Sequence, residues 1–346
     1  MLAKTKTTNI LLLFIVVPLV FFLLKTLSFI FIPLIMSMFI SVLFLPLMRW
    51  LKKRGLNKTV SIIVVVLIII ISLQIGLQLI QLSSREILST QDAFLLKAED
   101  KLTQILLWAE GVFGIDLQTD SNQISQFLNK DSITASIGPV LKSVGNTITM
   151  ALMTAFFTIL WLAESINVHQ VMHTLLIKQR HASIKTFIKI EDDLITFIKV
   201  KFFVSLGTGI FTGLACYFFD VSFPIFWGIF AFVINFIQMI GSFVTVIMLS
   251  IFALVELDPT GHLAFFIITI TGVQVLFGSI LEPVFMGKSF SINIITVLVM
   301  LMFWGFIWGV PGMILSIPIT VFIKIILEQF KSTRFIAEIL AGQTKV

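Results

Sequence analysis

The apolar positions of this chain run in long blocks, and the polar residues are confined to short stretches between them. A helix that crosses the hydrocarbon core of a bilayer needs roughly 20 predominantly apolar residues. Blocks of about this length predict six spanning helices, over residues 8–24, 27–48, 60–82, 146–163, 202–219 and 263–281.

Two further apolar runs are too long for one straight span. Residues 221–255 and 289–323 contain no charge over 35 positions each. A helix of that length measures about 52 Å, whereas the hydrocarbon core is about 30 Å thick. Each run must tilt, break or turn back, with Gly241 as the breaker in the first and Pro311 and Gly312 in the second. The pattern leaves crossing and re-entrant hairpins both open. Re-entrant hairpins from opposite faces suit alternating access better.

Composition supports a membrane location for the whole chain. Hydrophobic residues make up 58% and charged residues 12%, and the mean hydropathy is +1.08. A soluble domain has about a quarter charged residues. The sequence therefore predicts an all-α polytopic membrane protein of about eight membrane segments, including two broken or re-entrant helical hairpins. Cys216 is the only cysteine, so it forms no intrachain disulfide and is expected to be a buried hydrophobe.

The basic residues predict the orientation. Segments 49–58 and 164–201 are rich in Lys and Arg, so both are expected in the cytoplasm, together with both termini. The net charge of +6 is explained in the same way, and no nucleic-acid partner is expected. The predicted organisation is as follows: N-terminal membrane helices over 1–82, an extracytoplasmic amphipathic helical segment over 83–145, the fourth span and a cytoplasmic amphipathic helix over 146–201, a C-terminal transport core over 202–328, and a cytoplasmic tail over 329–346.

Helical spacing of apolar residues marks two amphipathic regions. The first lies in 83–145, where Leu95, Ala98, Leu102 and the later apolar residues at the same helical spacing share one face. These faces are expected to pack on one another or on a second subunit. The second runs from Ile184 to Lys201 with basic flanks. It is interpreted as a helix lying on anionic lipid, with a moving cytoplasmic strut as the alternative.

Sparse polar residues inside the C-terminal apolar runs are the candidate site. Polar groups at membrane depth usually face a cavity or the protein interior, and broken helices supply substrate sites in many transporters. The candidate substrate or ion ligands are Asn235, Gln238, Gly241, Gln274, Ser279, Glu282, Pro283, Gly287, Lys288 and Asn293.

Glu282 is the strongest of these candidates. It follows a long uncharged stretch and precedes the helix breaker Pro283, so its carboxylate could bind a cation or a proton. A structural ion pair with Lys288 or a simple anchor at the membrane interface is the alternative, and Lys288 could instead bind a lipid headgroup. Asn235 and Gln238 share one helical face, where their amides could bind a solute or form an interhelical hydrogen bond.

No motif for catalysis or nucleotide binding accompanies these residues. Walker, G-x-S-x-G, C-x-x-C and H-E-x-x-H patterns do not occur. The chain is therefore expected to be a gradient-driven transporter rather than an enzyme, without a cofactor or a metal site. A sodium/proton antiporter is the alternative within that class. An intramembrane enzyme or a non-transporting structural membrane protein is the alternative outside it.

The stretch GSILEPVFMGKSFSINIITVLVMLMFWGFIWGVPGMILSIPITVFIKIIL resembles the C-terminal signature of the autoinducer-2 exporter family. Upstream, IEDDLITFIKVKFFVSLGTGIFTGL and FPIFWGIFAFVINFIQMIGSF match in order and spacing. The resemblance implies export of a small polar solute or ion-coupled antiport in a bacterial or archaeal cytoplasmic membrane. It also implies a homo-oligomer, with a pentamer as the expected form.

This chain departs from the family pattern at three positions in the candidate site. Gln238 stands where the family usually has Pro, Ser279 where it usually has Asn, and Asn293-Ile294 where it often has His-Pro. The identity of the substrate is therefore not carried over from the resemblance.

Overall fold

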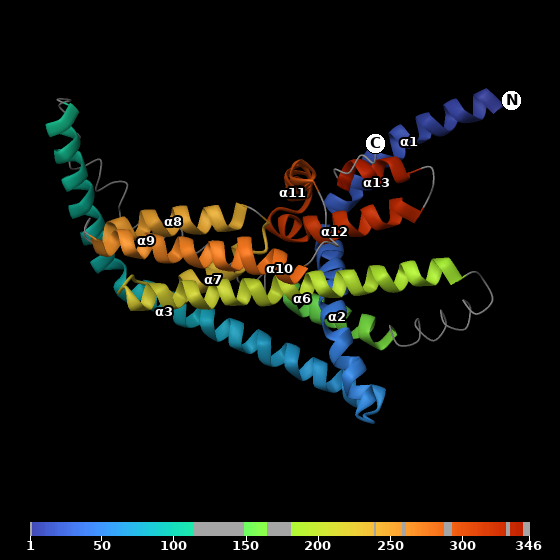
Figure 1. Cartoon of the computed structure of the whole chain (residues 1–346), viewed down its shortest axis with the longest axis horizontal. Helices are drawn as coiled ribbons and strands as arrows, with labels where there is room; N and C mark the ends of the chain where they lie inside the picture. Colours follow the sequence, from blue (N-terminus) through green and yellow to red (C-terminus); the bar gives the residue numbers. More distant parts are fainter. Residues whose placement is uncertain are drawn as a thin grey trace. The chain divides into compact units, whose positions relative to one another are not determined.

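The structure is a computed structural model of the whole chain, and it is helical in every regular element of the residues described here (Figure 1). The described residues are 2–113, 149–164, 181–238, 240–257, 261–286, 293–329 and 333–341. The predicted all-α class is confirmed.

Among these residues, five helices are long and apolar enough to cross a membrane. They cover Ser28–Lys53, Lys58–Thr90, Asp192–Phe218, Gly261–Met286 and Val310–Glu328. Large apolar side chains stand exposed on several of them, such as Phe203, Phe218 and Ile268. Contiguous exposed apolar surface is rare on soluble proteins, whereas helices of this length present such surface to lipid. The chain is therefore a multi-pass membrane protein, as predicted.

The chain divides into two compact units, each built from segments far apart in sequence. Unit 1 comprises residues 1–68, 150–200 and 286–346, and unit 2 comprises residues 69–149 and 201–285. Residues of the core predicted over 202–328 belong to both units, and the functional organisation expected from the sequence stays a prediction.

Unit 1 includes α1 (Leu2–Thr26), α2 (Ser28–Lys53) and three C-terminal helices, α11 (Ile294–Trp308), α12 (Val310–Gln329) and α13 (Arg334–Ala341). Its main apolar cluster joins Ile32 and Phe39 of α2 to Trp304 and Leu315 of the C-terminal helices. A hydrogen bond also joins α11 to α1, because the indole of Trp308 donates to the carbonyl of Leu24 at 2.9 Å.

Within the run 289–323, the described residues from 293 onward fold as a hairpin of α11 against α12, which is one of the forms that the sequence left open. The predicted breakpoint was misplaced. The turn is at Gly309, where a φ of +64° favours glycine, and Pro311 lies in the first turn of α12, where a missing N–H is tolerated. Gly312 serves the packing instead, because a Cβ there would lie 2.0 Å from the carbonyl oxygen of Trp304.

Unit 2 contains a second hairpin in the run 221–255. α7 (Pro224–Ile234) and α8 (Ile240–Glu256) pack on each other, and α8 packs in turn on α9 (Gly261–Gln274) (Figure 1). The break lies over residues 235–238 rather than at Gly241. Gly241 lies in the first turn of α8, where a Cβ would be 2.2 Å from the carbonyl oxygen of Ile234. Glycine there lets α8 start close against the end of α7.

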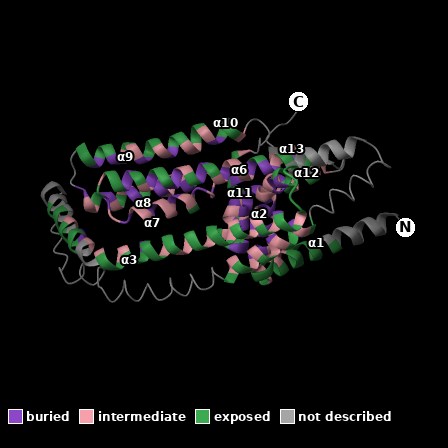
Figure 2. Cartoon of the chain, turned by 90° about the horizontal axis from the view of Figure 1, so that it is seen from below, coloured by how far each residue is buried: buried purple, intermediate pink, exposed green. Residues whose placement is uncertain are grey.

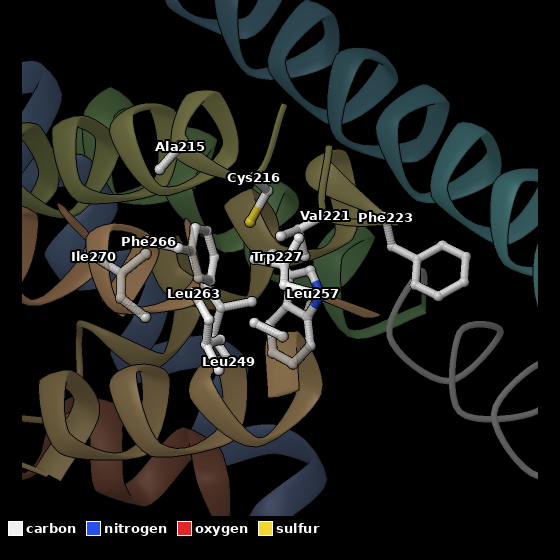
Figure 3. Close-up of a cluster of buried hydrophobic side chains, with 11 residues drawn as sticks. Ala215, Cys216, Val221, Phe223, Trp227, Leu249, Leu257, Leu263, Phe266 and Ile270 are labelled. Carbon is white, nitrogen blue, oxygen red and sulfur yellow. The ribbon is translucent and has the colours of Figure 1, made fainter. Parts of the chain in front are cut away.

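The core of unit 2 is a cluster of large apolar side chains from α6 (His181–Phe218), α7, α8 and α9. Cys216, Trp227, Leu249, Phe266 and Ile270 converge in it (Figure 3). Cys216 is fully buried there, as the sequence predicts for a small hydrophobe. Figure 2 shows exposed positions along α9, and Phe265 and Ile268 are among the exposed residues of this helix.

Small residues bring α6 and α7 close together. An added Cβ at Gly209 would lie 2.7 Å from the carbonyl oxygen of Gly228, and one at Gly228 would lie 3.0 Å from that of Gly209. The four-residue spacing of Ser205, Gly209 and Gly213 is typical of a close-packing face, and Gly209 and Gly213 do lie against α7.

Two helices run through boundaries that the sequence suggested. α3 extends unbroken over Lys58–Phe113, so the third span and the start of the predicted outer amphipathic segment are one helix of 56 residues. α6 joins the predicted cytoplasmic helix and the next span in one helix of 38 residues. Leu194 and Phe197 of its apolar stripe are buried in an apolar cluster of unit 1, so these two side chains pack on protein rather than lying on lipid. The rest of the outer segment, from 114 onward, lies outside the described residues.

Candidate functional site

One face of α6 carries a line of buried polar side chains through unit 2. Lys201, Ser205, Thr208 and Thr212 follow one another at helical spacing, and each is at most 5% exposed. This line meets the break between α7 and α8 and the start of α10. Because burying polar groups is costly unless they are hydrogen-bonded, their partners define the site.

Lys201 is the centre of this arrangement. Its ammonium nitrogen lies 3.1 Å from both carboxylate oxygens of Glu282 and 2.9 Å from the side-chain oxygen of Gln238. The lysine and glutamate side chains are only 6% and 4% exposed. A lysine ammonium has three N–H donors and no acceptor, so these three oxygens can satisfy it completely. Opposite charges cancel in a place where an isolated charge would be very costly.

The other polar contact at this level holds the tip of the α7–α8 hairpin. The amide nitrogen of Asn235 donates to the hydroxyl of Ser205 at 3.0 Å, and both residues are buried. Ser205 lies one turn after Lys201 on α6, just as Asn235 lies one turn before Gln238. We call these five residues, Lys201, Ser205, Asn235, Gln238 and Glu282, the hairpin-tip cluster.

Glu282 is placed in this cluster by an irregular helix. After α9 the chain continues as the π-helix η1 (Val275–Leu281), and Glu282 opens the short helix α10 (Glu282–Met286). The backbone N–H of Glu282 bonds the carbonyl of Phe277, five residues earlier. Pro283 explains the widening, since its ring would clash with the carbonyl four residues before it in an α-helix. Such π-turns are frequent at functional sites.

Gln274 lies at the end of α9 and is 4% exposed. Neither its amide oxygen nor its amide nitrogen bonds to a described residue. The structure thus buries this predicted residue in unit 2 without adding it to the hydrogen bonds of the hairpin-tip cluster.

The other predicted site residues have different positions. Ser279 and Pro283 are exposed on η1 and α10. Asn293 belongs to unit 1, where its side-chain oxygen accepts from the N–H of Ile295 and caps α11. Gly287 and Lys288 lie outside the described residues, so a pair between Glu282 and Lys288 stays a prediction.

Lys201 and Ser205 are functional candidates that sequence reasoning missed. Lys201 was counted among the cytoplasmic charges of 164–201, whereas the structure buries it. A signal was available, because Lys201 lies four residues after Phe197 and seven after Leu194, in line with the apolar stripe of the same helix. A lysine in line with a buried face needs a buried counter-charge.

A cavity of about 320 Å³ lies in unit 1 and is separate from this chemistry. It is lined by residues of α2 and α6: Pro46, Arg49, Trp50, Lys53, Asp192, Ile195 and Lys199. Three cations against one carboxylate make this cavity basic.

These features define a class of protein. A multi-pass helical membrane protein with broken helices and a buried polar cluster at the break has the architecture of a membrane transporter. The family model for AI-2E family transporters matches residues 10–332. The chain belongs to this family of membrane transport proteins, which confirms the resemblance found in the sequence.

Individual relatives agree with the family match. The chain is 25% identical to the AI-2 transport protein TqsA of Escherichia coli (strain K12) over 326 residues, covering 91% of this chain and 90% of that protein. It is 30% identical to a "Putative transport protein" of Borreliella burgdorferi over 224 residues, 63% of this chain and 62% of the relative. It is 25% identical to "Putative transport protein YrrI" of Bacillus subtilis (strain 168), covering 88% of each.

Proposed function

We propose that this protein exports a small polar solute, of the autoinducer-2 type, across the cytoplasmic membrane by gradient-driven alternating access. Support for a polar solute comes from the hairpin-tip cluster, and support for autoinducer-2 comes from the relative TqsA, which is an AI-2 transport protein. The observation that carries the proposal is the contact of buried Lys201 with both Glu282 and Gln238 at a break in an apolar hairpin.

The cluster supplies the chemistry that a polar solute requires. Gln238 and Asn235 offer amide donors and acceptors, and the Lys201–Glu282 pair offers a cation and an anion of zero net charge. In this conformation the groups bind one another. A solute with hydroxyl or carbonyl groups can exchange with those contacts, because it provides the same kinds of donors and acceptors.

The hairpin geometry supplies a way to couple binding to movement. The tip between α7 and α8 is held to α6 through the Ser205–Asn235 and Lys201–Gln238 hydrogen bonds. A solute that replaces the Gln238 contact with Lys201 weakens the attachment of the tip. Since a ligand shifts a conformational equilibrium only through differential affinity, this exchange gives the two conformations different affinities for the solute.

The test is flux of autoinducer-2 in proteoliposomes of purified protein. Gln238→Leu should raise the KM for autoinducer-2, because it removes an amide that offers hydrogen bonds to the solute. The rise should not depend on pH, since a neutral amide does not titrate. Arg334→Gln, on the exposed surface of α13, is the matched control and should leave flux unchanged. Wild-type protein that moves no autoinducer-2 under any imposed gradient would reject the proposal for this solute.

Sodium/proton antiport is a second candidate, supported by the buried carboxylate of Glu282. Among the described residues, Lys201 is the charged group that contacts it, and Na⁺ or a proton can replace the ammonium as its counter-charge. Glu282→Gln should then abolish sodium-dependent proton movement across a range of pH values. Sodium-independent solute flux that survives in this variant would favour the first candidate.

A further inference from the structure

The line of buried polar groups on α6 continues beyond the hairpin-tip cluster. Thr208 and Thr212 follow Lys201 and Ser205 along the same face, and both are fully buried. The hydroxyl of Thr208 donates to the carbonyl of Val204 at 2.9 Å. The hydroxyl of Thr212 has no hydrogen-bond partner among the described residues.

The register of the helices places Gln274 at this level. α6 runs antiparallel to α9 and η1, because Lys201 contacts Glu282 while Phe211 packs on Phe277 at 5.3 Å between ring centroids. The next turn of α9 therefore lies beside Thr208 and Thr212 of α6. That turn ends in Gln274.

α8 contributes a fourth polar side chain to the same layer. A Cβ added at Gly278 would lie 3.3 Å from the hydroxyl oxygen of Ser242, which fixes the register of α8 against η1. One turn further along α8, Thr245 is 1% exposed, and its hydroxyl donates to the carbonyl of Gly241. The layer of Thr208, Thr212, Thr245 and Gln274 thus lies between the hairpin-tip cluster and the apolar core that contains Ile270 and Leu249 (Figure 3).

Two members of this layer are buried without partners, which needs an explanation. Almost all buried polar side chains in native proteins are hydrogen-bonded. Both amide atoms of Gln274 and the hydroxyl of Thr212 are exceptions within this layer, whereas Trp227, Ser250 and Trp304 are isolated exceptions elsewhere among the described residues. Apolar residues would fill this space at a lower cost in stability, so the polar groups point to a ligand.

We propose that Gln274 and Thr212 form a second binding site in unit 2, for a hydroxyl group of a small neutral solute. An amide oxygen accepts, an amide nitrogen donates, and a threonine hydroxyl does both, which complements a hydroxyl group. No charged side chain belongs to the layer, so it favours a neutral group over an ion. The identity of the solute rests on the proposed export function, whereas the existence of the site does not.

Stability and affinity together separate this role from a structural one. Gln274→Met and Thr212→Val keep the side-chain volume and remove the polar atoms. Because they remove buried groups without partners, thermal midpoints should stay equal or rise. The KM for autoinducer-2 should rise about tenfold for each, the effect of losing one hydrogen bond. Thr269→Val is the control, since that hydroxyl on α9 is exposed and already bonded to Phe265.

Cysteine labelling tests the site without relying on transport. Thr212→Cys and Gln274→Cys in a Cys216→Ser background should react with a small hydrophilic thiol reagent faster than Leu249→Cys, which is equally buried in the apolar core. Glycerol, as a neutral polyol probe, should slow the labelling of both, whereas sodium chloride of equal osmolality should not.

Labelling of both cysteines no faster than that of Leu249→Cys would overturn the proposal. A fall in thermal midpoint of Gln274→Met with an unchanged KM would also overturn it, because Gln274 would then be a structural amide. Labelling that is fast but not slowed by glycerol, with an unchanged KM, would assign the layer to water alone and reject the solute site. Wild-type protein that fails to move autoinducer-2 would reject the exported solute, while the labelling rates would still decide the site.

Discussion

The ammonium of Lys201 lies 3.1 Å from both carboxylate oxygens of Glu282, although 81 residues separate the two in the chain. The pair joins α6 to the segment that follows the π-helix, inside unit 2. Buried pairs of this kind are strongly destabilising when only one partner is removed, whereas removal of both is often tolerated. That asymmetry gives the first prediction.

Single removal of either charge should destabilise the protein, and double removal should restore much of the loss. We expect Lys201→Met or Glu282→Gln alone to cost about 3–5 kcal/mol, because each leaves the other charge buried and unpaired. The double variant should be closer to wild type. Unfolding of purified protein in mild detergent measures this. Arg334→Met is the control, since its pair with Glu338 is exposed and should be worth about 0.5 kcal/mol.

The transport assay then separates structure from function in the same variants. If the pair is only structural, the double variant should regain flux together with stability. If the pair binds solute or a coupling ion, the double variant should be stable and inactive. A double variant that is both stable and fully active would remove this pair from the mechanism.

Gly241 should not tolerate a larger residue. A Cβ there would lie 2.2 Å from the carbonyl oxygen of Ile234, and backbone atoms cannot rotate away. We expect Gly241→Ala to lower the thermal midpoint and to weaken the attachment of the hairpin tip. Gly272→Ala on α9 is the matched control. An added Cβ meets nothing within 4 Å there, so this variant should be stabilised by about 0.5–1 kcal/mol. Equal midpoints for the two alanine variants would contradict the close approach.

Orientation in the membrane can be tested with exposed positions. In a Cys216→Ser background, Leu96→Cys and Leu107→Cys on α3 should react with an impermeant thiol reagent added outside sealed cells, because both side chains are exposed. Leu56→Cys, in the basic segment after α2, should react only after the membrane is opened. The reverse pattern would invert the orientation expected from the positive-inside rule.

The exposed apolar side chains of α3 are expected to mediate self-association. Leu96 and Leu107 are 65% and 63% exposed beyond the part of α3 that is long enough to span the membrane. Wild-type protein in mild detergent should have the mass of a homo-oligomer by light scattering, and Leu96→Glu/Leu107→Glu should have a smaller mass. A monomeric wild type that retains transport would contradict this expectation.

Residue patterns predicted the helices and an interruption in each of the two long apolar runs, but they did not predict the residues at which each run turns. Apolar block length and the absence of charge over 221–255 and 289–323 required broken helices. The exact turns depended on tertiary packing: the first hairpin breaks at 235–238, where Ser205 and Lys201 of α6 bind the tip. In the second hairpin Gly312 is needed for its contact with Trp304, and Gly309 supplies the turn.

Only part of the candidate site could be predicted from the sequence, because the rest also depends on tertiary packing. Glu282, Asn235 and Gln238 were identifiable as polar residues inside apolar runs. Their partners Lys201 and Ser205 were not identifiable from the sequence. Lys201 adjoins a basic segment, and local composition alone therefore assigns it to a cytoplasmic loop. Only the pairing of segments far apart in sequence, here α6 with the end of η1, distinguishes a buried lysine from a cytoplasmic one.

The π-helix η1 sets the direction in which the side chains of α10, and Glu282 in particular, leave the helix axis. Successive residues of an α-helix are rotated by about 100° around the axis, so the number of residues in η1 decides which side of the helix Glu282 occupies. Loss of one residue from Val275–Leu281 would turn Glu282 by about 100°, away from Lys201, without altering any residue of the hairpin-tip cluster. The length of this segment is thus as much a part of the site as the side chains that it positions.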